Sequence, residues 1–214
     1  MWHNMSKGIL TVISGFSGAG KGTVTKGLIK KHPEYELSVS ATSRAPREGE
    51  VNGKDYLFLT RDEFESNIKD GDFIEWTEYV GNYYGTPKSN VIKQLEAGKD
   101  VILEIEVQGA LNVKKIFPEA VLIFLAPPSF DELRARLTGR GTEDEETVNK
   151  RLLQACDEAQ YIYHYEYYVV NNDVDDCIEQ IRTIIANEHS LVQNNKAKID
   201  SIYNEIDLFK KGEL

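Results

Sequence analysis

Apolar and polar positions follow two alternating patterns along the chain. Short continuous apolar runs are typical of strands buried on both faces of a sheet, and four stand out: 9–14, 101–106, 121–125 and 167–170. Between them lie stretches with helical periodicity, such as residues 21–31, where His32 and Pro33 end the predicted helix. Strands separated by helices are typical of βαβ units, so the pattern predicts an α/β protein with a parallel core sheet.

Local signals mark where several helices begin and end. A Ser or Thr followed three residues later by Glu can form a capping box, in which each side chain accepts the other residue's backbone N–H. This pattern occurs at three predicted helix starts: Thr60 with Glu63, Ser129 with Glu132, and Thr142 with Glu145. Gly98 follows residues 92–97 and is predicted to cap the end of that helix, because glycine readily adopts the left-handed conformation.

Three segments depart from this alternation. Residues 37–84 hold short strand-like pieces at 56–59 and 73–80 with one short helix between them, which predicts a small inserted subdomain with antiparallel strands. Residues 130–150 are charged and rich in arginine. Residues 187–214 are polar and weakly amphipathic, and they are predicted to form a helical tail.

The composition is that of an ordinary soluble globular protein of 214 residues, 41% hydrophobic and 28% charged. Lys and Arg number 25 and Asp and Glu 35, so the net charge is 25 − 35 = −10 and no broad nucleic-acid surface is expected. No apolar run approaches the ~18 residues of a membrane span, and no secretory signal is visible, although Met5 offers an alternative start. Cys156 and Cys177 fit no zinc spacing, and we expect reduced thiols in a cytoplasmic protein.

Directly after the first predicted strand, residues 15–23 read GFSGAGKGT and match the phosphate-binding pattern G-x-x-x-x-G-K. Glycines let backbone N–H groups converge on phosphate oxygens, and the following helix presents its positive end to the same anion. Lys21 is expected to reach the terminal phosphates. Gly22 stands where Ser or Thr usually follows the lysine, so Thr23 becomes the candidate ligand of phosphate or Mg²⁺. This variant resembles nucleoside monophosphate kinases more than GTPases.

Arginine is concentrated in two parts of this acidic chain, which is informative because the guanidinium group suits phosphate. Six of the eight arginines form two clusters: Arg44 and Arg47, then Arg134, Arg136, Arg140 and Arg151. Arg136 and Arg140 lie four residues apart and share a face if their helix continues. Arg134 is offset and expected on the surface, whereas Arg151 can point back into the same space. The sequence therefore predicts a second anion site besides the phosphate loop.

Five segments together closely resemble guanylate kinases: 38–58 (SVSATSRAPREGEVNGKDYLF), 73–76 (FIEW), 81–87 (GNYYGTP), 103–110 (LEIEVQGA) and 139–152 (GRGTEDEETVNKRL). They occur in the family's order and spacing, and the resemblance covers about residues 8–186. It implies a three-layer P-loop kinase fold, α/β with a parallel core sheet, divided as follows: a core of 8–36, 88–129 and 152–186, an inserted mixed-β GMP-binding subdomain at 37–87, a small helical lid at 130–151, an N-terminal extension at 1–7 and a helical tail at 187–214.

The resemblance also implies which residues surround GMP: Ser40, Arg44, Arg47, Tyr56, Glu75, Tyr84, Thr86, Glu104 and Glu106. The two arginines and two tyrosines of this set would hold the phosphate. Glu75 and Glu106 would accept hydrogen bonds from the N1–H and the amine of guanine, which adenine cannot offer in the same way. Glu104 and Glu106 lie two apart on the predicted strand and so share a face, with Glu104 near Lys21 or Mg²⁺.

On the donor side, the family's pattern implies ATP as co-substrate and Mg²⁺ as cofactor. The residues that would bind ATP are Gly15, Phe16, Ser17, Gly18, Ala19, Gly20, Lys21, Gly22 and Thr23, with Asn171 against adenine. Phe16 stands where the family usually has Pro. The residues that would act on the transferring group are Lys21, Arg136, Arg140 and Arg151. The implied reaction is ATP + GMP ⇌ ADP + GDP between small molecules, in purine metabolism, by a monomer or homodimer.

Two alternatives stay open at this point. Another nucleoside monophosphate kinase, such as an adenylate kinase, would share the phosphate loop, but Ser40, Glu75, Thr86 and Glu106 favour guanine. A non-catalytic guanylate-kinase-like interaction module would share the fold, but such modules have lost the nucleotide machinery that Lys21 and the lid arginines represent here.

Overall fold

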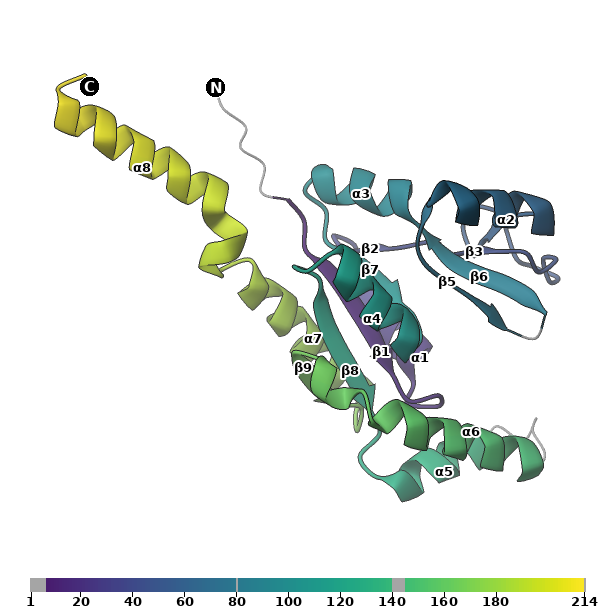
Figure 1. Cartoon of the computed structure of the whole chain (residues 1–214). Coiled ribbons are helices and arrows are strands. Elements are labelled where there is room, and N and C mark those ends of the chain that lie inside the picture. Colours follow the sequence, from purple (N-terminus) through teal and green to yellow (C-terminus); the bar gives the residue numbers. More distant parts are fainter. Residues whose placement is uncertain (1–6, 80, 140–144, 214) are drawn as a thin grey trace.

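The core of the protein is a parallel sheet, as the sequence predicts. The computed structural model describes residues 7–79, 81–139 and 145–213 (Figure 1). Five strands pair in the order β2-β7-β1-β8-β9, all parallel. Their bounds are β1 (Leu10–Gly15), β2 (Glu36–Leu37), β7 (Val101–Glu104), β8 (Val121–Ala126) and β9 (Tyr167–Val170).

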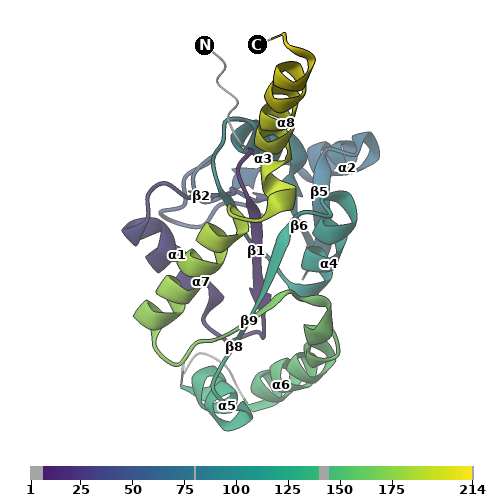
Figure 2. The same cartoon turned by 90° about the vertical axis from the view of Figure 1, so that its left-hand side faces the viewer.

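Helices cover both faces of this sheet and make three layers, with α1 and α7 on one face and α3 and α4 on the other (Figures 1 and 2). Ile13 of β1 packs in one cluster with Leu28 and Ile181, whereas its neighbour Val12 packs in the other with Val113. Burial on both faces explains why β1 is a continuous apolar run. The helices are α1 (Lys21–Lys31), α3 (Lys88–Glu96), α4 (Val107–Ile116) and α7 (Val174–Glu188).

A second, four-stranded sheet lies within residues 37–87, in the order β4-β3-β6-β5. Its strands are β3 (Ala41–Thr42), β4 (Leu57–Phe58), β5 (Phe73–Tyr79) and β6 (Asn82–Pro87). The prediction of antiparallel strands is confirmed for β5–β6 and β3–β6. It is wrong for β3–β4, which pair in parallel because a long connection returns the chain to the same end of the sheet.

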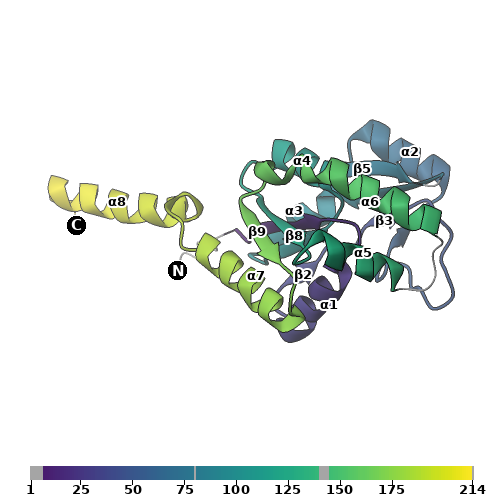
Figure 3. The same cartoon turned by 90° about the horizontal axis from the view of Figure 1, so that it is seen from below.

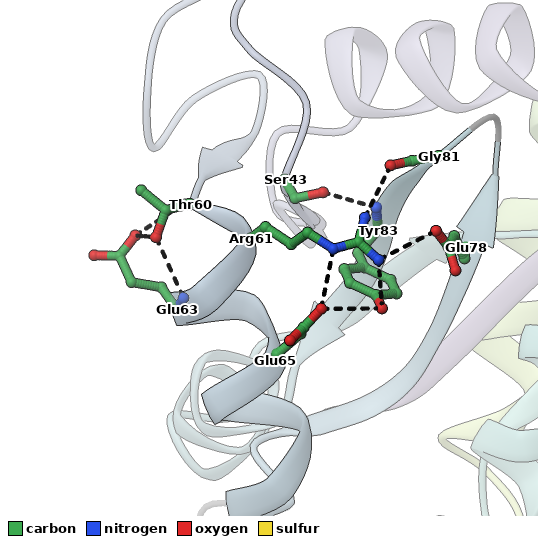
Figure 4. Close-up of polar contacts among 8 residues, drawn as sticks. All are labelled: Ser43, Thr60, Arg61, Glu63, Glu65, Glu78, Gly81 and Tyr83. Atoms are coloured by element: carbon green, nitrogen blue, oxygen red, sulfur yellow. Dashed lines mark hydrogen bonds and ion pairs between the residues drawn. The ribbon is translucent and has the colours of Figure 1, made fainter.

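Helix α2 (Arg61–Asp70) holds this sheet from one side, and its predicted start is confirmed (Figure 4). Thr60 Oγ1 accepts the Glu63 N–H at 3.2 Å, and Glu63 Oε2 accepts the Thr60 N–H at 2.7 Å. Arg61 then donates to Glu65 Oε1 at 3.0 Å and to the Tyr83 hydroxyl at 2.9 Å, which ties the helix to β6. These contacts attach α2 to the sheet.

Helices α5 (Phe130–Thr138) and α6 (Glu145–Ala159) pack together at the carboxyl end of the core sheet. The predicted cap of α5 is confirmed, because the Ser129 hydroxyl accepts the Glu132 N–H at 3.1 Å. Thr142, the predicted cap of the next helix, and Arg140 lie outside the described residues. Helix α6 is continuous from 145 to 159, so the predicted boundary at 151 falls inside one helix.

The tail is helical, as predicted. After α7 come the 3₁₀ turn η2 (Val192–Asn195) and α8 (Lys196–Lys211), and another such turn, η1 (Ile162–His164), precedes β9. Helix α8 points away from the rest of the molecule (Figures 1 and 3), and none of its residues is buried. Nowhere in the described ranges does a helix combine the length and apolar character needed to cross a membrane.

Removing residues 196–214 is expected to leave the thermal midpoint unchanged, because α8 contributes no buried side chain. The matched control removes residues 187–214. It also deletes Glu188, which accepts the Tyr167 hydroxyl at 2.6 Å, and His189, which contacts Asp100 at 2.9 Å, so it should lower the midpoint. Thermal denaturation of the two truncated proteins measures the difference, and a drop in the shorter truncation would show that α8 packs on the body.

Candidate active site

The connection between β1 and α1 curls around a cavity of about 370 Å³. Gly20, the last residue before α1, has φ +94°, a region that other residues rarely adopt. A Cβ there would also lie 2.5 Å from Nδ2 of Asn171. Gly20 is thus required both for the turn and for the packing beneath it. The N-terminus of α1 faces the cavity, and this arrangement suits a phosphate group.

The unusual glycine after the lysine also has a structural reason. A Cβ on Gly22 would lie 3.2 Å from Oε1 of Glu104. Serine or threonine at this position would therefore crowd the carboxylate at the end of β7. Burial raises the pKa of Glu104, and the positive charge of Lys21 opposes this effect. Glu104 thus lies next to the loop position at which the more common form of the motif carries a hydroxyl.

Lys21 is held at the mouth of the loop with 10% of its side chain exposed. Its Nζ donates to the carbonyl of Gly15 at 2.8 Å and to that of Phe16 at 3.5 Å, and lies 3.4 Å from Oε2 of Glu106. These contacts fix the ammonium group beside the cavity. A phosphate that enters the cavity would meet this charge.

The predicted placement of Glu104 and Glu106 on one face of a strand is wrong. β7 ends at Glu104, which is paired with Ile13, and separates there from β1, which continues to Gly15 beside β8. Glu106 instead precedes α4 as its N-cap residue. It is exposed and contacts Lys21, while Glu104 also lies near Lys21, as expected.

Two arginines reach the phosphate loop from the helices α5 and α6. Arg151 Nη2 donates to the Ser17 hydroxyl at 2.9 Å. Arg136 Nη2 donates to the Asn171 carbonyl at 2.9 Å, and its Nη1 to the Ala19 carbonyl at 3.4 Å. Asn171 is 4% exposed, and its Nδ2 donates to the same Ala19 carbonyl at 2.8 Å. Its amide therefore supports the loop from below, a role that its predicted contact with adenine did not include.

Other predicted residues of this half lie as follows. Arg134 is exposed, as expected. Thr23 and Lys26 line the cavity from the first turns of α1. Phe16 packs edge-on against Phe124 of β8, with ring centroids 4.9 Å apart, so an aromatic contact anchors the loop at this position.

A second cluster of charged and phenolic groups lies on the smaller sheet. Arg44 makes a two-pronged pair with Glu50, at 3.0 and 2.9 Å, and Glu50 also accepts the Arg47 N–H at 2.7 Å. The hydrogen bonds from Arg44, and then that from the Arg47 backbone, lower the pKa of Glu50. The Arg44 guanidinium lies 5.5 Å from the centre of the Tyr56 ring. Glu50 therefore holds the Arg44 guanidinium next to the Tyr56 ring before any ligand binds.

Tyr84 completes this cluster from β6. Its ring centroid lies 6.2 Å from that of Tyr56. Neighbouring residues on a strand point to opposite faces, and Tyr83 accordingly stacks on Phe64 on the other side of the sheet, at 5.3 Å. Burial raises the pKa of the Tyr56 phenol, so it stays protonated and can donate a hydrogen bond. Ser40 is half-buried, next to β3, and Arg47 is exposed.

Glu75 of β5 is a buried carboxylate, 8% exposed. Thr86 Oγ1 donates to its Oε1 at 2.6 Å. Burial raises the pKa of Glu75, and the hydrogen bonds from Thr86 oppose this shift. A Cβ on Gly109 would lie 2.9 Å from the other oxygen of Glu75, so α4 approaches the carboxylate closely. The first turn of α4 therefore carries Glu106 beside Lys21 and Gly109 beside Glu75, and it joins the two halves of the site.

Sequence reasoning missed two carboxylates, Glu50 and Glu158. Glu50 lies six residues after Arg44, and an acidic residue next to an arginine cluster is a signal that could have found it. Glu158 continues the buried stripe of α6 that includes Leu152 and Ala155, where an apolar residue is expected. A charged residue in an apolar stripe is the signal for this second position.

The family resemblance implies Mg²⁺, and the donor groups here fit it. Among the described residues, no three His, Cys, Asp or Glu side chains gather around one point. Mg²⁺ usually takes only one or two protein ligands and completes its shell with water and substrate phosphates. The Thr23 hydroxyl and the Glu104 carboxylate line the same cavity, and both are oxygen donors suited to an ion that arrives with a nucleotide.

Comparison with known proteins gives the same picture over most of the chain. The family model described as guanylate kinase matches residues 7–188. The guanylate kinase of Caldanaerobacter subterraneus is 53% identical over 89% of this chain and 92% of its own length. That of Clostridium tetani is 50% identical over 97% and 96%. The crystal structure of guanylate kinase from Anaplasma phagocytophilum is 34% identical, with a TM-score of 0.70 over 87% of this chain and 89% of that one. By sequence and fold, the chain belongs to the guanylate kinase family.

Proposed function

We propose that the protein transfers the γ-phosphoryl group of ATP to GMP and releases ADP and GDP. The observation that carries the proposal is the junction at the first turn of α4, which contacts the lysine of the phosphate loop through Glu106 and approaches the buried carboxylate of Glu75 at Gly109. The proposed enzyme requires Mg²⁺ and serves purine nucleotide metabolism in the cytoplasm, as a monomer or homodimer that uses neither nucleic acid nor a membrane.

The cluster around Arg44 suits the phosphate of GMP. Arg44 supplies a planar guanidinium, Tyr56 and Tyr84 supply hydroxyl donors, and Arg47 adds a second cation from the same segment. Glu50 holds Arg44 in place by its two-pronged contact. Because the fork is oriented before the ligand binds, less entropy is lost on binding.

The buried pair of Glu75 and Thr86 suits guanine. Glu75 keeps one oxygen on Thr86 and has further lone pairs for the N1–H and amine of the base. Adenine presents an acceptor at N1, which would leave a buried carboxylate facing a lone pair at considerable cost. Thr86 and Ser40 carry hydroxyls that can donate to the guanine O6.

Transfer between two bound phosphates needs alignment, charge neutralisation and exclusion of water. The attacking GMP phosphate is already an anion, so no general base is needed. Lys21 would neutralise charge that develops on the transferring group. Arg136 and Arg151 contact the phosphate loop, which places their positive charges close to where this group would lie. We include Arg140 in this set by family resemblance. Mg²⁺, when bound, would supply further charge neutralisation on the phosphates, and Thr23 and Glu104 are the residues that would hold it.

Replacing Glu75 by Gln tests the base-reading role. The amide presents a donor where only an acceptor fits, so KM for GMP should rise by about 10- to 100-fold while KM for ATP changes little. Glu78→Gln, an exposed position on the same strand, is the matched control. A coupled assay of ADP release with GMP, AMP, UMP and CMP measures both selectivity and KM. Unchanged GMP kinetics in Glu75→Gln would remove the base-reading role, and wild-type activity on AMP equal to that on GMP would overturn the substrate assignment.

A further inference from the structure

Helix α6 places an acidic residue on its buried side. Leu152 and Ala155 of this helix pack against α5, and Glu158, about one turn further on, is 6% exposed. Burying a carboxylate is costly unless hydrogen bonds compensate for the lost water. The reaction as described so far gives this residue no part, so its burial needs a reason.

Both oxygens of Glu158 have donors. Oε2 accepts the backbone N–H of Ser17 in the phosphate loop, at 3.3 Å. Oε1 accepts Nε2 of Gln154 at 2.9 Å. The Ser17 side chain is held as well, because Nε and Nη2 of Arg151 donate to its hydroxyl at 3.2 and 2.9 Å. Two residues of α6, two turns apart, therefore hold Ser17: Glu158 accepts its backbone N–H, and Arg151 donates to its side chain.

The electrostatic surroundings connect Glu158 to the same loop. Burial raises the pKa of its carboxyl group, the positive charge of Lys21 opposes that shift, and Glu106 adds to it. Lys21 thus acts electrostatically on Glu158 and makes an ion pair with Glu106. The pKa direction agrees with the geometry, in which the carboxylate lies behind the phosphate loop while Lys21 lies at its mouth.

We propose that Glu158 is a positioning residue, which fixes the Ser17 N–H so that the phosphate loop keeps its curl and α6 moves together with it. Without an acceptor, this N–H would be free to turn, and the loop would lose part of the preorganised shape that ATP phosphates need. Arg151 makes the second attachment, so the helix that carries a phosphate-directed cation is tied to the loop that binds the phosphates. The inference rests on the proposed function, in that ATP is the ligand of the loop.

Two conservative variants separate positioning from charge. Glu158→Gln keeps the length and one carbonyl acceptor for the Ser17 N–H, so KM for ATP should stay within about twofold of wild type. Glu158→Asp keeps the charge but shortens the side chain by one methylene and withdraws the carboxylate from Ser17. It should raise KM for ATP by about five- to tenfold and leave KM for GMP unchanged. Glu146→Asp, an exposed position on the same helix, is the control.

The experiment combines steady-state kinetics with calorimetric titration of ATP and thermal denaturation of each variant. A purely structural role would lower the thermal midpoint and shift both KM values alike, which would overturn the proposal. An unchanged KM for ATP in Glu158→Asp would also overturn it. Calorimetric titration measures ATP binding without GMP, so it tests this inference separately from the reaction. A wild-type protein that binds ATP but fails to phosphorylate GMP would contradict the proposed function and leave this inference standing.

Discussion

Lys21→Met is expected to lower kcat by about a thousandfold, which is the typical loss when a preorganised charge is removed from a phosphoryl-transfer site. The ammonium group is held by two loop carbonyls at the mouth of the cavity, so it costs no reorganisation when charge develops on the transferring group. Methionine fills similar space without the charge. A coupled assay of ADP release at saturating ATP and GMP measures the loss.

The matched control for this variant is Lys31→Met, at the far end of the same helix, where the lysine pairs with Asp175 on the surface. It should retain wild-type turnover, and both variants should unfold at the wild-type temperature. Turnover that survives Lys21→Met would overturn the role assigned to Lys21, whereas a wild-type protein without turnover would favour the alternative of a non-catalytic interaction module with the same fold.

Arg44→Ala is expected to raise KM for GMP by about a hundredfold with little change in KM for ATP. The variant loses the guanidinium that faces the phosphate position, and it also leaves the Glu50 carboxylate without its two-pronged partner. That uncompensated negative charge would then repel the GMP phosphate, so the effect should exceed the loss of the hydrogen bonds alone.

Arg61→Ala serves as the control in the same subdomain. Arg61 is half exposed and contacts Glu65, Glu78 and Tyr83 on the outer side of the sheet (Figure 4). Its loss should affect stability more than KM. If Arg44→Ala and Arg61→Ala changed KM for GMP equally, the assignment of the phosphate site to the Arg44 cluster would be wrong.

Local patterns predicted the elements whose ends are set locally. Residues 21–31 and 167–170 match α1 and β9, since the first is limited by Gly20 and His32 and the second is a short apolar run. The end of β7 was mispredicted because the apolar pattern does not show where the strand separates from its neighbour. β7 leaves β1 after the pair Glu104–Ile13, although β1 continues to Gly15 beside β8, and Glu106 becomes the N-cap residue of α4.

The part of the site that sequence reasoning missed depends on long-range contacts. Glu158 acquires its role from Ser17, 141 residues earlier, and Asn171 from Ala19, 152 residues earlier. The apolar stripe of α6 marks Glu158 as unusual, but no pattern in the sequence identifies Ser17 or Ala19 as the partner, because only the folded sheet brings these segments together. The phosphate loop was predictable for the opposite reason, since its glycines and lysine act within nine consecutive residues, 15–23.

The first turn of α4 sets the spacing between the two halves of the site. Glu106 and Gly109 are three residues apart, which corresponds to about 4.5 Å along a helix and a rotation of about 300°. Inserting or deleting one residue between them would rotate one position by about 100° relative to the other, so either the contact with Lys21 or the close approach to Glu75 would be lost. Length variation should therefore be tolerated in the tail, where α8 buries nothing, and forbidden in this single turn.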